Sequence, residues 1–308
     1  MTAPEQVALE LVGADGSVWS LTTRGAPAQL LGGITGLFNA DGETRWTTRD
    51  VGRRRRGRIV QGRSVSFQVL LGDNLHPSSA PWRAVNAAWW AALGGGDDPF
   101  TLRLTLPETD SLGRPDVRTL QLWDTSTDPG TSAVFSPYAG RAVFPVTAEA
   151  ESAFWSGPEV TASFVYNPAA DVDYYGGPDG LGPPFYIGGG SQFDNATISN
   201  PGQTPAWLRW AITAPFSSAS VGVGGDLIPL PFAQVLSQRV VIETDPRRRS
   251  ITDGAGNNLW PLIGPGLEPL FAPVPSGMSV PLSIVLDNPA AGSRVDVALP
   301  PEYRRAWG

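Results

Sequence analysis

Proline and glycine interrupt this chain so often that most of it cannot form long helices. The 308 residues include 36 glycines and 30 prolines, and short runs of alternating apolar and polar residues lie between them. Proline lacks the backbone donor that a helix needs, and alternation with a period of two is typical of a half-buried strand. The sequence therefore predicts an all-β protein with many short strands joined by tight turns.

One segment, SSAPWRAVNAAWWAALGGG, departs from this pattern. Its side chains Trp82, Val85, Trp89 and Leu93 recur at helical spacing and fall on one stripe that can pack against a sheet. Trp90 lies beside the centre of this stripe, and we interpret it as part of a wider core face rather than as a ligand platform. We expect a single helix among the strands, ending at Gly94.

The strands divide into two groups. At the start, VALELVGADGSVWSLTT contains two alternating runs around Asp15 and Gly16, a strong hairpin signal. Further along, DVDYYGGPDGLGPPFYIGGGSQ is crowded with glycine, proline and aspartate and has no periodicity, so we place a domain boundary before it. We expect residues 1–168 to form a β-sandwich or barrel-like domain with the helix, and residues 169–308 to form a second β-sandwich.

Composition excludes several classes of function. The chain has no cysteine, which removes disulfides, thiolate metal sites and cysteine nucleophiles. Its net charge of −7 gives no global attraction to nucleic acid, so we expect no specific nucleic-acid recognition. The N-terminus lacks the features of a signal peptide and no long apolar run occurs, so we expect neither secretion nor membrane insertion. All 22 basic residues are arginine, which we interpret as the codon bias of a GC-rich genome.

Candidate catalytic and metal-binding residues are few. His76 is the only histidine and stands in a turn, which disfavours a catalytic triad or a zinc site. Paired carboxylates that could serve a glycosidase occur only in loops or at strand ends, where solvated loop acids are the simpler interpretation. Asp171, Asp173 and Asp179 weakly resemble a calcium loop but lack its spacing and its closing glutamate. We expect no enzyme activity, no cofactor and no metal.

Two sets of residues are candidates for interaction sites. The first is an arginine run that could face an acidic partner, a neighbouring subunit or a DNA-conducting lumen, or could be a solvated loop between strands. It consists of Arg53, Arg54, Arg55, Arg56 and Arg58. The second is the pair Trp207 and Trp210, which are three residues apart on an expected strand and so point to opposite faces. We treat both as candidate exposed aromatics that could stack on a sugar.

The order of elements resembles the distal tail protein family of long-tailed bacteriophages (siphoviruses). The resemblance is carried by the N-terminal hairpin, the loop ITGLFNADGE, the basic segment RDVGRRRRGRIVQGRSVSFQVLLGD, the helix PWRAVNAAWWAAL, the segment SFVYNPAADVDYYG and the strand entry NPGQTPAWLRWAIT. It covers most of the chain, although each motif is degenerate. The arginine run and the long Gly/Pro connector depart from the family pattern.

This resemblance implies a structural virion protein with no catalytic residues. Its N-terminal domain would form a ring, expected to be a homohexamer, and its C-terminal domain would be a galectin-like β-sandwich. The implied partners are the tail tube protein, the tape-measure protein and other proteins of the tail-tip hub. The implied location is the tail tip of the virion, after synthesis in the host cytoplasm, and the composition suggests an actinobacterial host.

Two alternatives remain open from the residues. A carbohydrate-binding or receptor-binding minor tail protein would use the second domain to adsorb to host cell-wall glycan through an exposed aromatic. A cell-wall hydrolase is a weaker alternative because the sequence offers no credible catalytic pair.

Overall fold

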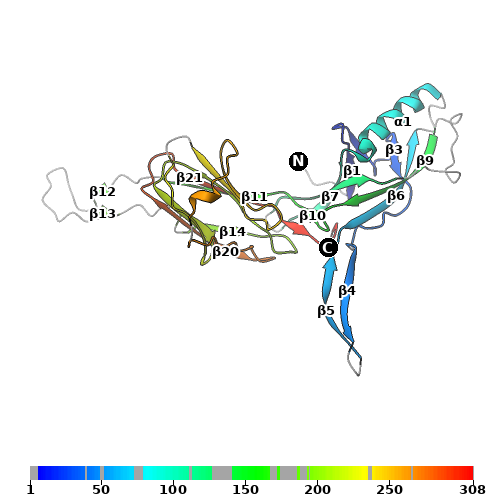
Figure 1. The fold of residues 1–308 in the computed structure, drawn as a ribbon. Helices are drawn as coiled ribbons and strands as arrows, with labels where there is room; N and C mark the ends of the chain where they lie inside the picture. Colours follow the sequence, from blue (N-terminus) through cyan, green and yellow to red (C-terminus); the bar gives the residue numbers. More distant parts are fainter. Residues whose placement is uncertain are drawn as a thin grey trace. The chain divides into compact units, whose positions relative to one another are not determined.

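The computed structural model describes the chain except for residues 1–5, 39, 49–51, 73–78, 111–112, 127–140, 167–171, 174–185, 188–192, 194, 235–237, 265 and 308. The described residues contain one α-helix, α1 (Ser79–Leu93), and otherwise mostly strands (Figure 1). The expected all-β fold with a single helix is therefore confirmed. Within the described residues, the short 3-10 turns Gly94–Gly96 and Trp260–Leu262 add little to the helical content.

The chain forms two compact units. Unit 1 consists of Met1–Pro158 together with Glu302–Gly308, and unit 2 consists of Glu159–Pro301. Unit 2 is thus inserted into unit 1 near its C-terminal end. The domains expected from the sequence differ from these units at two places, because the strand Val160–Val165 pairs within unit 2 and the last residues return to unit 1.

Unit 1 is built on a large, nearly closed sheet. Its main path runs β2-β1-β7-β8-β9-β6-β3. The backbone N–H of Leu30 in β3 donates to the carbonyl of Leu21, just after β2, at 2.9 Å, so the two ends of the sheet approach each other. The strands are β1 (Ala8–Val12), β2 (Val18–Ser20), β3 (Ala28–Leu30), β6 (Arg63–Gly72), β7 (Phe100–Thr109), β8 (Pro115–Asp124), β9 (Arg141–Ala150), β10 (Trp155–Ser156) and β22 (Glu302–Tyr303).

Alternation places the core of unit 1. In β6, Val65, Phe67 and Val69 are buried while the residues between them are more exposed, as expected of a half-buried strand. The helix packs on this core with Trp82, Trp89 and Leu93 buried, which confirms these three residues of the predicted stripe, whereas Val85 is only partly buried. Trp90 is partly buried and its ring meets Phe144 edge-on at 5.6 Å between centroids, so it widens the core face.

Unit 2 is a sandwich of two antiparallel sheets with one core between them. One sheet has the order β11-β21-β15-β18-β19 and the other β14-β20-β16-β17. The strands are β11 (Val160–Val165), β14 (Thr197–Ser199), β15 (Arg209–Thr213), β16 (Ser218–Val223), β17 (Asp226–Leu230), β18 (Arg239–Glu243), β19 (Ser250–Asp253), β20 (Ser279–Asp287) and β21 (Arg294–Leu299), with a small pair β12 (Val172–Asp173) and β13 (Tyr186–Ile187).

Candidate interaction surface: the arginine-rich hairpin

The arginine run is a strand and not a loop. β5 (Arg53–Val60) pairs antiparallel with β4 (Gly42–Thr48), from the pair Gly42 and Val60 to the pair Thr48 and Arg53 (Figure 1). The backbone of all five predicted arginines lies in β5, and the side chains of Arg54, Arg55 and Arg56 are exposed. The interpretation of this segment as a solvated loop is therefore wrong, because backbone pairing with β4 fixes it in extended form.

The hairpin carries a concentrated positive charge. Residues 42–60 contain seven arginines against Glu43 and Asp50, whereas the rest of the chain contains 15 arginines and 27 acidic residues. The hairpin is thus strongly basic and the remainder strongly acidic. Arg56 is partly held in place, because its Nε donates to Thr47 Oγ1 at 2.8 Å. A charge asymmetry of this kind favours association between the hairpin and an acidic surface.

The hairpin also exposes apolar side chains and strand edges. Trp46 is 54% exposed, and Ile59 and Val60 are also exposed. Among the described strands, β4 and β5 pair only with each other. An isolated two-stranded hairpin is marginally stable in water, and open strand edges tend to be covered by a partner. The hairpin thus combines exposed apolar side chains with strand edges that no other described strand covers.

The base of the hairpin is fixed to unit 1 by backbone hydrogen bonds. The N–H of Asp41 donates to the carbonyl of Gly62 at 2.9 Å, and the N–H of Gln61 donates to the carbonyl of Asp41 at 3.0 Å. The carboxylate of Asp41 accepts from both the backbone N–H and the hydroxyl of Ser64, each at 2.7 Å. The position from which the hairpin leaves the sheet is therefore set by β6.

Residues 302–307, the C-terminal tail, are bound to unit 1 close to this base. Arg63, at 1% exposure, donates to the carbonyls of Gly36, Ala153 and Arg304, the last at 2.7 Å. Its burial lowers the pKa of the Arg63 guanidinium, while the charge of Asp41 acts in the opposite direction. A buried cation is costly unless its donors are satisfied, and these carbonyls satisfy them.

A second buried arginine also holds the tail. Arg118 makes a two-bond ion pair with Asp116, donates to the carbonyl of Arg305 at 2.9 Å and lies 4.0 Å from the ring centroid of Tyr303. Burial raises the pKa of the Tyr303 phenol, the Asp116 carboxylate raises it further, and Arg118 opposes both. Arg63 and Arg118 thus hold the backbone of consecutive tail residues.

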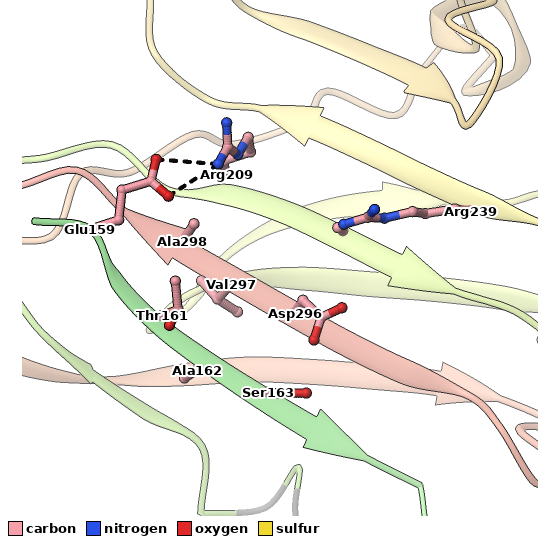
Figure 2. Close-up of a pocket in the computed structure, with 10 residues that line it drawn as sticks. Glu159, Thr161, Ala162, Ser163, Arg209, Arg239, Asp296, Val297 and Ala298 are labelled. Atoms are coloured by element: carbon pink, nitrogen blue, oxygen red, sulfur yellow. Dashed lines mark hydrogen bonds and ion pairs between the residues drawn. The ribbon is translucent and has the colours of Figure 1, made fainter.

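Unit 2 carries a separate polar groove on the outer face of its larger sheet (Figure 2). The groove has a volume of about 450 Å³, and the small side chains of Ala211 and Ala298 on neighbouring strands leave room for it. Around it, Arg209 is paired with Glu159 at 3.2 Å, and Asp296 and Arg239 stand further along the sheet (Figure 2). The hydroxyls of Thr161 and Ser163 add to these charged groups, so the rim offers both hydrogen-bond donors and hydrogen-bond acceptors.

The predicted aromatic pair is only partly correct. Trp210 is 1% exposed and belongs to the sandwich core, so its prediction as an exposed aromatic is wrong. The reason is alternation along this segment, which directs Leu208, Trp210 and Ile212 inward and Arg209 outward. By the same alternation Trp207 lies on the outward side with Arg209, but it is only partly exposed. It is not among the residues that line the groove.

Asn200 explains the turn that precedes this strand. Its buried side chain donates to the carbonyls of Thr204 and Val274, both at 2.9 Å, and accepts from the backbone N–H of Gly202 at 2.8 Å. Gly202 sits two residues after Asn200, where the side chain can close a compact turn. The segment NPGQTPA is thus a structural connection, and the sequence alone did not identify Asn200 as its organising residue.

Other candidate residues fall largely outside the described part of the chain. His76, Asp171 and Asp179 are among the undescribed residues, and only the backbone of Asp173 is described. In the described ranges, no group of three His, Asp or Glu side chains could hold a metal ion. None of the described helices has the length and apolar character needed to cross a bilayer.

No model of a known protein family and no curated protein sequence matches this chain. Solved structures do match. The crystal structure of SPP1 Dit, a hub protein of the adsorption apparatus in phages that infect Gram-positive bacteria, superposes with a TM-score of 0.57 and 10% identity, covering 94% of this chain and 98% of that one. A chain of the phage P2 baseplate in its activated conformation with Ca superposes with a TM-score of 0.51 and 12% identity, covering 97% of this chain and 99% of that one.

The superpositions show a shared fold, while identities of 10% and 12% say nothing about the roles of individual residues. The coverage is nearly complete in both directions, so the likeness includes both units and is not limited to one common sandwich. The chain therefore has, over almost its whole length, the fold found in phage tail hub and baseplate proteins.

Proposed function

We propose that this protein is a structural component of a phage tail tip, of the distal tail type, and that it acts by assembly without catalytic turnover. Copies of unit 1 would close into a ring, expected to be a hexamer, that joins the tail tube to the tail-tip apparatus. Its partners would be the tube, tape-measure and hub proteins, and its location the virion. The observation that carries the proposal is the match to SPP1 Dit over 94% of this chain.

The hairpin of β4 and β5 is the surface that we assign to ring contacts. Its guanidinium groups suit two-bond pairing with carboxylates, and the acidic remainder of a second copy supplies them. A heterologous contact of this kind, repeated from copy to copy, closes a ring when the rotation between copies allows it. The ring would also cover the edges of β4 and β5.

Mass in solution tests the proposal directly. We expect light scattering on the purified full chain to give a multiple of the 32.6 kDa protomer, and negative-stain images of the same peak to show a ring with a central hole. The same measurement with added tail tube protein tests whether the ring needs a template. A protein that stays monomeric at all concentrations, alone and with the tube protein, would contradict the proposal.

Shortening the hairpin separates assembly from folding. Because Gly42 and Val60 are paired, residues 43–59 can be replaced by Asn-Gly, which forms a two-residue hairpin turn. We expect this variant to be monomeric with a melting temperature within a few degrees of the wild type, since the core of unit 1 lies elsewhere. A variant that fails to assemble and also melts at a much lower temperature than the wild type would show that the hairpin serves folding instead.

Adsorption to a cell-wall glycan is a second candidate, and the polar groove of unit 2 is the observation that favours it. A rim with donors and acceptors around an alanine floor can accommodate the hydroxyl groups of a sugar. Binding of the full chain to a glycan array tests this candidate. Signals that are lost in both Arg239→Ala and Asp296→Ala would support it, and an array without signals would remove it.

A further inference from the structure

A second groove lies in unit 1, between the base of the hairpin and the C-terminal tail. It has a volume of about 370 Å³. The basic part of its lining consists of Arg55 from β5 and Arg304 and Arg305 from the tail, and the apolar part includes Phe38, Val60 and Phe154. Three segments far apart in sequence therefore form one surface that is both cationic and apolar.

The groove is built on fixed backbone. The carbonyls of Arg304 and Arg305 are held by the buried guanidiniums of Arg63 and Arg118, so the two tail side chains leave from restrained positions. The ring of Phe38 packs edge-on against Trp307, with 4.7 Å between centroids. Preorganised groups lose little entropy when they bind, which favours a recognition surface.

The charges of the groove define what it can bind. The lining contains three guanidinium groups and, among the described residues that form it, no carboxylate. Asp41, near the base of the hairpin, is occupied by the two hydrogen bonds from Ser64. Arg55 and Arg305 therefore favour a ligand that brings carboxylates, together with an apolar group that can contact Phe38, Val60 and Phe154.

We propose that this groove is the docking site for an acidic, partly apolar surface of a second copy of this chain. The proposal rests on the ring assembly proposed above and names the residues that make the contact. The occupant is identified by charge complementarity, because the chain outside residues 42–60 has 27 acidic against 15 basic residues. Continuity with the basic hairpin supports the same partner, since Arg55 belongs to both surfaces.

A photo-crosslink from within the groove tests the proposal. The full chain would carry p-benzoylphenylalanine in place of Phe154, in an equal mixture of ¹⁴N-labelled and ¹⁵N-labelled protein, and would be irradiated at low and at high salt. We expect crosslinked peptides of mixed isotope, which identify contacts between copies, with an acid-rich partner peptide. Their yield should fall at high salt, because screening weakens contacts between exposed charges.

Matched arginine variants add a quantitative test. Arg55 lines the groove, whereas the neighbouring Arg54 does not and points to the opposite face of β5. We expect Arg55→Ser and Arg305→Ser each to weaken self-association about tenfold or more, as measured by sedimentation velocity, since arginine anchors are frequent energetic centres of interfaces. Arg54→Ser, with the same loss of charge, is expected to have a clearly smaller effect.

The outcomes distinguish the two proposals. Two results would overturn the groove proposal while leaving the tail-hub role intact. One is a ring that forms without isotope-mixed crosslinks from position 154. The other is self-association that is weakened equally by Arg54→Ser and Arg55→Ser. A chain that neither assembles nor crosslinks between copies, alone and with added tail tube protein, would overturn both. Crosslinks between copies with selective loss in Arg55→Ser and Arg305→Ser would establish the groove as the contact.

Discussion

Gly36 lies where the hairpin side of unit 1 meets the C-terminal tail, and its backbone geometry strongly disfavours any side chain. Its φ of +83° lies in the left-handed region. A Cβ atom at this position would meet the carbonyl oxygen of Ser64 far inside contact distance, at 2.0 Å. Its own carbonyl accepts from the buried Arg63. Any shift of Gly36 would therefore disturb the arginine that holds the tail.

Substituting Gly36 by alanine should destabilise unit 1. We expect Gly36→Ala to cost more than about 2 kcal/mol, since positive φ and a backbone clash add together. Gly33→Ala is the matched control, because Gly33 lies in the same loop with nothing within 4 Å of the added Cβ. Differential scanning calorimetry of the full chain would show the change as a lower transition temperature for unit 1 alone. Equal effects of the two substitutions would contradict this account.

Residue-level predictions from the sequence succeeded where local pattern decides the outcome. Helical spacing predicted a buried stripe, and its members Trp82, Trp89 and Leu93 are buried, while its fourth member, Val85, is only partly buried. For Trp207 and Trp210 the alternation showed that the two side chains point to opposite faces, but not which face meets the second sheet. The groove arginines could not be grouped from sequence, because Arg55 and Arg305 meet only in the folded unit.

The C-terminal tail is the element that the sequence patterns did not predict. Its strand β22 has two residues, and its pairing partner β10 has two as well. Such short strands carry no periodicity that a sequence pattern could reveal. Their contribution comes from burial of Tyr303 and Ala306 and from the carbonyls that satisfy Arg63 and Arg118.

Removing the tail should destabilise unit 1 while leaving the stability of unit 2 unchanged. A chain that ends at Pro301 loses these buried side chains, and two buried guanidiniums each lose one acceptor, because Arg63 loses the carbonyl of Arg304 and Arg118 loses that of Arg305. We expect a loss of about 3 kcal/mol or more in the free energy of unfolding of unit 1. Hydrogen exchange read by mass spectrometry would show faster exchange in β6 and β8 and unchanged exchange in β15 and β21.

The control for this truncation is Trp307→Ala, which keeps the backbone acceptors of residues 304 and 305. It is expected to fall between the wild type and the truncated chain, since only the contact with Phe38 and its neighbours is lost. If the truncated chain exchanged like the wild type in β6 and β8, the tail would be a passive end of the chain and not a part of the fold of unit 1.

Unit 2 is a domain inserted between two segments of unit 1. Within unit 2, Val160 pairs with Leu299, so its first and last strands bring its two ends side by side. Within unit 1, Ser156 pairs with Glu302, so the points where the chain leaves and re-enters are also adjacent. A domain whose two ends are adjacent can be inserted into another domain, or removed from it, without a large change in either backbone.

Each unit should therefore fold without the other. We expect a chain in which residues 159–301 are replaced by Gly-Gly to fold, because the replacement leaves a short hairpin loop between Ser156 and Glu302. We expect the excised segment 159–301 to fold as a monomer, because it contains both sheets of the sandwich and their core. Calorimetry would assign one transition of the full chain to each piece.

The same two pieces locate self-association. Because the hairpin and the groove both lie in unit 1, the shortened chain should still assemble with the same number of copies as the full chain, and the excised unit 2 should not. Assembly by unit 2 alone would move the contact to the sandwich. Failure of the shortened chain to fold would show that unit 1 needs unit 2 for folding. The nearly closed sheet and the bound tail would then not be enough to stabilise unit 1.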